Sequence, residues 1–65
     1  MQKSFKVVDS SQHKIIKFNP ISDFSWRVVT QQHKSTSIQY MTNEEVKKSY
    51  DYFSSHWMDY DLQYI

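Results

Sequence analysis

The chain of 65 residues contains no cysteine and no glycine, and Pro20 is its one proline. Without cysteine, disulfide bonds and thiolate metal sites are excluded, and the composition says nothing about the redox compartment. Without glycine, the chain has no glycine-rich phosphate loop, no dinucleotide fingerprint and no glycine helix cap. A domain of about 60 residues buries only about 60% of its unfolded surface. The fold must therefore be held by packing or by association with a partner.

Other residue types and patterns are also missing. No run of about 18 apolar residues occurs, and the basic-apolar-small order of a signal peptide is absent, so we expect a cytoplasmic protein with no membrane partner. Alanine is absent and leucine occurs once, whereas Lys, Ile, Phe and Tyr are plentiful. This composition is typical of AT-rich genes of phages, plasmids and low-GC bacteria. The length allows one domain, residues 1–65.

Charge is distributed unevenly along the chain. Residues 1–40 hold six basic and two acidic side chains, a net charge of +4, whereas residues 41–65 hold two basic and five acidic side chains, a net charge of −3. This asymmetry suits head-to-tail association or one strongly polarised surface. Charge balance between two parts of the same fold explains it equally well.

The first 40 residues predict four strands. β-Favouring runs span residues 5–8, 13–18, 24–30 and 35–40. They are separated by the turn-forming Asp9-Ser10-Ser11, by Asn19-Pro20 and a short connection, and by the polar segment 31–34. We therefore expect an antiparallel sheet of about four strands.

A helix is predicted to begin at Thr42. Thr42 and Glu45 have the spacing of a capping box, in which a hydroxyl and a carboxylate satisfy two backbone amides. Met41 and Val46 occupy the flanking positions of a hydrophobic staple. Apolar side chains then recur at helical spacing as one stripe: Val46, Tyr50, Phe53, Trp57, Tyr60 and Tyr64.

The end of this helix is ambiguous. Residues 58–64 also alternate between apolar and polar side chains, as a strand would. Asp59 and Asp61 would lie at the negative end of a continued helix, which is unfavourable. We expect a helix over about 43–57 followed by an extended tail or a fifth strand. The predicted fold class is α+β, with one C-terminal helix packed on the sheet.

Strand alternation predicts two different sheet faces. One is expected to pack under the helix and to hold Phe5, Val7, Ile16, Phe18, Trp26, Val28, Ile38 and Tyr40. The other holds Lys6, Val8, Ile15, Lys17, Arg27, Val29 and Gln39. Cations mixed with aliphatic side chains indicate either a binding surface or aliphatics that are exposed singly.

Catalytic and metal-binding patterns are weak. His13, His33 and His56 lie in separate segments without paired ligand spacing, so we expect no metal and no cofactor. No serine occupies a nucleophile elbow, and Asp59 and Asp61 resemble an acid/base pair only superficially. The protein is therefore expected not to be an enzyme.

The leading functional hypothesis is a non-enzymatic protein-binding module. It would be a small regulator or inhibitor, encoded by a phage or mobile element, that occludes a surface of a larger host protein. The C-terminal segment supplies the candidate partner-binding residues, whether as a helix or as an added strand: Met58, Tyr60, Leu62, Tyr64 and Ile65. The alternative is that this segment folds back on its own sheet.

A second hypothesis is binding of DNA or RNA through a basic sheet face. Its candidate residues are Lys6, Lys17, Arg27 and Lys34. Base stacking requires aromatic side chains on that face, and the predicted phase places all of them in the core. A third hypothesis is homo-oligomerisation through the open face of the sheet.

Overall fold

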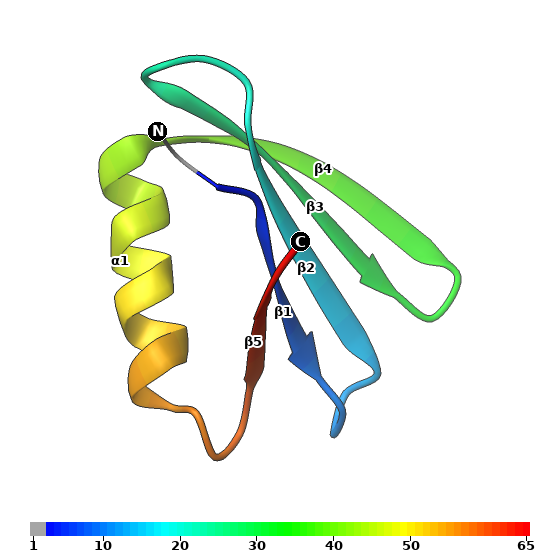
Figure 1. The fold of residues 1–65 in the computed structure, drawn as a ribbon. Coiled ribbons are helices and arrows are strands. Elements are labelled where there is room, and N and C mark those ends of the chain that lie inside the picture. The colour runs from blue at the N-terminus through cyan, green and yellow to red at the C-terminus, as the bar shows by residue number, and fades with distance from the viewer. Residues whose placement is uncertain (1–2) are drawn as a thin grey trace.

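A computed structural model describes residues 3–65 as one antiparallel sheet with a helix on one face (Figure 1). The elements are β1 (Phe5–Asp9), β2 (Lys14–Pro20), β3 (Ser25–Gln32), β4 (Ser35–Thr42), α1 (Asn43–Ser55) and β5 (Asp61–Tyr64). The strand order is β4-β3-β2-β1-β5, so the chain crosses from one edge of the sheet to the other through α1. The predicted α+β class is confirmed.

Strand β2 continues through Asn19 and Pro20, two residues beyond the predicted end. Pro20 pairs with Trp26 of β3, but β1 begins at Phe5, which pairs with Phe18. The end of β2 therefore lies beyond the start of β1. A proline without an N–H group is tolerated there, because no ladder bond toward β1 is required.

Both tight hairpins close with a histidine in the left-handed region. In the β1–β2 turn the Asp9 carboxylate accepts hydrogen bonds from the Ser11 amide (3.2 Å) and the Ser11 hydroxyl (2.7 Å), as the sequence predicted for a turn. His13 and His33 have φ angles of 52° and 54°. A chain without glycine must place side-chain-bearing residues at these positions, at a cost in backbone strain.

The predicted capping box begins α1. The Thr42 hydroxyl accepts from the Glu45 amide (3.3 Å), and the Glu45 carboxylate accepts from the Thr42 amide (3.1 Å). Of the predicted staple residues, Val46 is buried in the hydrophobic core and Met41 is partly buried against it. The helix ends at Ser55, two residues before the expected end.

Residues 61–64 form a fifth strand, which settles the ambiguity of the C-terminal segment. β5 pairs with β1, with Leu62 opposite Val7 and Tyr64 opposite Phe5. The predicted helical stripe is right as far as Phe53 and wrong beyond it, because Trp57 lies in the turn after α1 and is exposed. The free edge of β1 provides hydrogen-bond partners that a longer helix would leave unused.

The core lies between α1 and one face of β1, β2 and β3. Its buried members are Phe5, Val7, Phe18, Trp26, Val28 and Val46. The Phe5 ring stacks on Phe18 with centroids 4.6 Å apart, and the Tyr50 ring of α1 meets Phe5 edge-on at 5.3 Å. Such pairs add about 0.5–1.5 kcal/mol beyond the burial of apolar area.

The predicted phase of β4 is wrong by one residue. The register places Gln39 opposite Val28, Ile38 opposite Val29 and Tyr40 opposite Arg27. Ile38 and Tyr40 therefore lie on the face away from the helix, and Gln39 lies on the helix face. The two-residue turn at 33–34 fixes this register, and a shift of one residue moves every side chain to the other face.

Within residues 3–65, no helix has both the length and the hydropathy that crossing a membrane requires.

Candidate functional site

The sheet has an open face opposite α1. The strand registers place these side chains on it: Lys6, Val8, Ile15, Lys17, Arg27, Val29, Ile38 and Tyr40. Because α1 and the core occupy the other face, no element of the described residues covers this one (Figure 1). We call these eight side chains the open-face set.

The cations of the open-face set are not neutralised by their cross-strand neighbours. Lys6 lies directly opposite Lys17, and the outer neighbours of this pair are Gln63 and Val29. Like charges directly opposite each other destabilise a sheet. Arg27 lies between Asn19 and Tyr40. No acidic side chain therefore lies directly opposite any of these three cations.

Apolar side chains lie between these cations. Val8 is opposite Ile15, and Val29 is opposite Ile38. Ile38 and Tyr40 are 52% and 66% exposed. The open face is thus a mixture of cationic and apolar strips, with its aromatic ring beside an arginine.

Most acidic residues of the C-terminal third lie away from this surface. Glu44, Glu45 and Asp51 are on α1, which covers the opposite face. Asp61 is the exception, because it lies opposite Val8 at the β5 edge. The uneven charge distribution of the sequence therefore becomes a difference between the two sides of the molecule.

The structure brings together three of the four predicted nucleic-acid-binding residues. Lys6, Lys17 and Arg27 share the open face, whereas Lys34 lies in the β3–β4 turn. Sequence reasoning missed Ile38 and Tyr40 as members of this face. The signal that would have found them is the two-residue turn, whose length sets which residues of β3 and β4 are opposite each other.

The predicted partner-binding segment is part of the fold. Tyr60 and Leu62 are partly buried against the core. Met58 is 82% exposed in the turn before β5, and Tyr64 and Ile65 are exposed at its end. Tyr64 bonds to Tyr50 of the helix, and the Ile65 amide donates to the Ser4 carbonyl.

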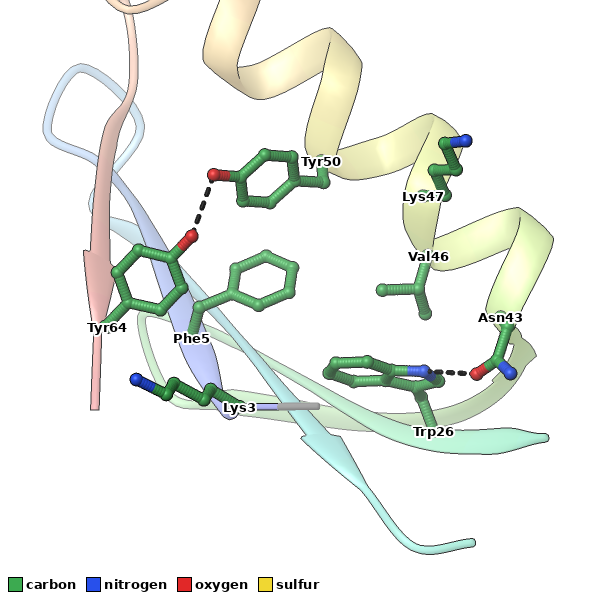
Figure 2. Close-up of a pocket in the computed structure, with 8 residues that line it drawn as sticks. All are labelled: Lys3, Phe5, Trp26, Asn43, Val46, Lys47, Tyr50 and Tyr64. Atoms are coloured by element: carbon green, nitrogen blue, oxygen red, sulfur yellow. Dashed lines mark hydrogen bonds between the residues drawn. The ribbon is translucent and has the colours of Figure 1, made fainter. Parts of the chain in front are cut away.

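A cavity of about 360 Å³ lies between the first turns of α1 and the sheet (Figure 2). Its floor is aromatic and aliphatic, and two hydrogen bonds cross it. Trp26 Nε1 donates to Asn43 Oδ1 (2.8 Å), and the Tyr50 and Tyr64 hydroxyls are 2.8 Å apart. The lining residues are Lys3, Phe5, Trp26, Asn43, Val46, Lys47, Tyr50 and Tyr64.

The polar groups of this cavity are neutral or point out of it. The hydrogen bond with Tyr64, followed by desolvation, raises the pKa of the Tyr50 hydroxyl above its usual value, which makes this phenol a weaker acid than an ordinary tyrosine. In Figure 2 the Lys47 amine points away from the rings. The cavity is suited to an apolar group, and it presents neither a nucleophile nor an activated base.

The three histidines do not converge. The rings of His13 and His33 are 6.2 Å apart on neighbouring turns, while His56 Nδ1 lies 2.7 Å from the Tyr52 carbonyl at the end of α1. Among residues 3–65, no group of three or more His, Asp or Glu side chains is arranged to hold a metal ion.

No protein-family model matches the chain, and neither a curated protein nor a solved structure is significantly similar to it.

Proposed function

We propose that this is a non-enzymatic binding protein whose open face docks on an acidic, partly apolar surface of a larger protein. The supporting observation is the open-face set, in which unneutralised cations alternate with aliphatic side chains that no part of the described fold covers. The cations would meet carboxylates of the partner, and the aliphatics would be buried between them. In this role the protein would act as a small regulator or inhibitor by occluding that surface.

A rigid sheet is a suitable base for such an interface. A backbone already fixed in neighbouring strands needs no ordering when it binds, so the entropic cost of association is limited to the side chains. Burying apolar area contributes roughly 25 cal/mol per Å² before those costs are subtracted. Arginine and tyrosine, here Arg27 beside Tyr40, are also the residue types enriched where interfaces are strongest.

Single-stranded nucleic acid is the second candidate, and one observation favours it. Tyr40 lies on the same face as Lys6, Lys17 and Arg27, so a base could stack on its ring while the cations contact phosphates. Val8, Ile15, Val29 and Ile38, however, have no part in phosphate contacts. A protein partner accounts for both the cations and the aliphatic side chains of the open-face set, and we therefore prefer it.

Two pairs of substitutions test the open face, and the second pair separates the two candidates. Lys17→Glu with Arg27→Glu reverses charge and should abolish binding of either partner. Ile15→Thr with Val29→Thr removes apolar surface but retains β-branched residues, which keeps the strands stable. Lys47→Glu with Lys48→Glu, on exposed positions of α1, serves as the matched charge control. Circular dichroism checks that each variant is folded.

The assay is photocrosslinking from an unnatural side chain at Gln31, an exposed position of β3, in nuclease-treated lysate of the native host. We expect a discrete protein adduct that both open-face variants lose and the α1 control retains. Binding of oligonucleotides by fluorescence anisotropy is measured in parallel. A salt-sensitive oligonucleotide affinity that survives the threonine variant would replace the proposal with the nucleic-acid alternative.

A further inference from the structure

The free edge of the sheet at β4 lacks the usual protection against pairing. β4 is eight residues long, contains no charged residue and no proline, and is exposed along its length apart from Met41. The other edge, β5, has four residues and begins with Asp61. Natural edge strands are normally kept short, charged or interrupted, because a long uncharged edge is a template for another strand.

The hydrogen bonds identify which peptide groups of β4 are free. The Ser25 carbonyl accepts from the Ile21 amide (3.0 Å), so Ser25 bonds toward β2. Successive residues of a strand bond to alternate sides, and the next residue, Trp26, therefore bonds toward β4. Through the β3–β4 register, the residues of β4 that bond to β3 are Ser35, Ser37, Gln39 and Met41.

The alternate residues of β4 therefore direct their peptide groups outward. These are Thr36, Ile38 and Tyr40, each with an N–H and a C=O at the free edge. Thr42 follows the same phase, and its outward amide is already bound by the Glu45 carboxylate at 3.1 Å. The free edge thus has three donor–acceptor residues centred on Ile38.

We propose that a second copy of this chain pairs antiparallel along β4, with Ile38 opposite Ile38 of that copy. In this register Tyr40 lies opposite Thr36, and Ser35 lies opposite Met41. Thr36, Ile38 and Tyr40 of one copy lie opposite Tyr40, Ile38 and Thr36 of the other. Each of these three pairs exchanges two hydrogen bonds, so about six hydrogen bonds form between the two copies. An aromatic ring beside a β-branched residue is a favourable cross-strand pair.

The charges near β4 are compatible with pairing between two copies of this chain. No like charges meet at the axis, because β4 has no charged residue and Lys6 and Lys17 lie on β1 and β2, two or more strands away. Arg27 lies on the neighbouring strand β3, but it is opposite Tyr40, two residues along from Ile38, so the two copies' arginines are displaced to opposite sides of the axis. The register also places Lys34 of one copy opposite Thr42 of the other, where Glu44 and Glu45 form the acidic first turn of α1. Each end of the paired strands therefore joins a cation to an acidic helix start.

Ile38 offers a test, because in the proposed dimer it lies opposite Ile38 of the second copy. Analytical ultracentrifugation of the full chain up to about 1 mM should show twice the monomer mass of 7.9 kDa. Ile38→Lys and Ile38→Glu should each be monomeric, whereas an equimolar mixture should regain the dimer. Gln31→Lys and Gln31→Glu place the same charges on β3, away from the axis, and should change the association little.

A proline tests the hydrogen bonds themselves. Ile38→Pro removes an outward N–H that β3 does not use, so the fold should be retained while two central bonds are lost from the dimer. With about 1 kcal/mol for each bond, the dissociation constant should rise about thirty-fold. Circular dichroism confirms folding.

Three results would overturn the inference. They are a wild-type chain that remains at 7.9 kDa, a dimer that both charged variants retain, and a charged mixture that stays monomeric. If the true partner of this edge is a strand from a different protein, the isolated wild-type chain would remain monomeric. The inference does not depend on the proposed function, because it is argued from the outward peptide groups of β4. Ile38 and Tyr40 belong to both surfaces, whereas Ile15→Thr with Val29→Thr alters the open face and leaves every residue of β4 intact, so the two failures are distinguishable.

Discussion

Asn43 links the start of the helix to the sheet, so its removal should destabilise the fold. Its Oδ1 accepts from the Trp26 indole N–H (2.8 Å), and its Nδ2 donates to the Asp23 carbonyl (2.6 Å). The Asn43 amide also donates to the Phe24 carbonyl. Trp26 is only 5% exposed, so water cannot readily replace the lost acceptor.

Asn43→Ala should destabilise the fold by about 2.5 kcal/mol. An unsatisfied buried donor costs about 1–3 kcal/mol and a lost neutral hydrogen bond about 1 kcal/mol. The higher helix propensity of alanine offsets about 0.5 kcal/mol of this loss in the free energy of unfolding. For a domain of this size, 1 kcal/mol corresponds to about 4–8 °C, so the melting temperature should fall by about 10–20 °C.

Thermal and urea unfolding, followed by circular dichroism, measure this loss. Asn43→Asp is the matched control, because it keeps the acceptor for Trp26, gives up only the bond to Asp23 and adds a charge that suits a helix start. It should lose less than half as much stability. A double-mutant cycle with Trp26→Phe should give a coupling energy of about 1 kcal/mol or more. An alanine variant within about 0.5 kcal/mol of the parent would refute the reasoning.

Three further predictions follow from local geometry. Thr42→Ala removes the capping hydroxyl and should cost about 1 kcal/mol in urea unfolding, whereas Thr42→Ser should cost little. His33→Gly relieves a φ of 54° and should raise the free energy of unfolding by about 1 kcal/mol, and a decrease would show that the side chain is needed in the turn. The pKa of Tyr50 is raised chiefly by its hydrogen bond with Tyr64. The protonated Tyr50 hydroxyl therefore stabilises the fold at pH values below the usual tyrosine pKa, and this stabilisation is lost as the pH rises through the raised pKa. Tyr64→Phe should lower the titration midpoint of Tyr50 in NMR of ring-labelled tyrosine, and an unchanged midpoint would contradict this cause.

Local chemistry made part of the fold and of the site predictable. The capping box at Thr42 and the Asx turn at Asp9 each involve side chains within three residues of the groups they bind, so the sequence alone specifies them. Alternation within β1, β2 and β3 correctly separated core residues from the cations Lys6, Lys17 and Arg27. The period of two along each strand is therefore enough to assign these three cations to one face.

The interaction of Asn43 with Trp26 was not predictable in the same way. The two residues are 17 positions apart, and their contact exists only because β3 and the start of α1 meet at one end of the sheet. An asparagine at the first helical position has many local roles, and nothing in its neighbours indicates a partner on β3. Only the packed structure identifies it as a link between elements.

By itself, the amino-acid sequence determined the number of early strands, the start of the helix and the mixed character of one sheet face. The tertiary structure decided the face of Ile38 and Tyr40 and the conversion of residues 61–64 into a strand. The physical reason is the same in both cases. An alternating pattern has two possible phases, and one segment can fit both a helical and a strand period. The choice between them depends on hydrogen-bond partners that lie elsewhere in the chain.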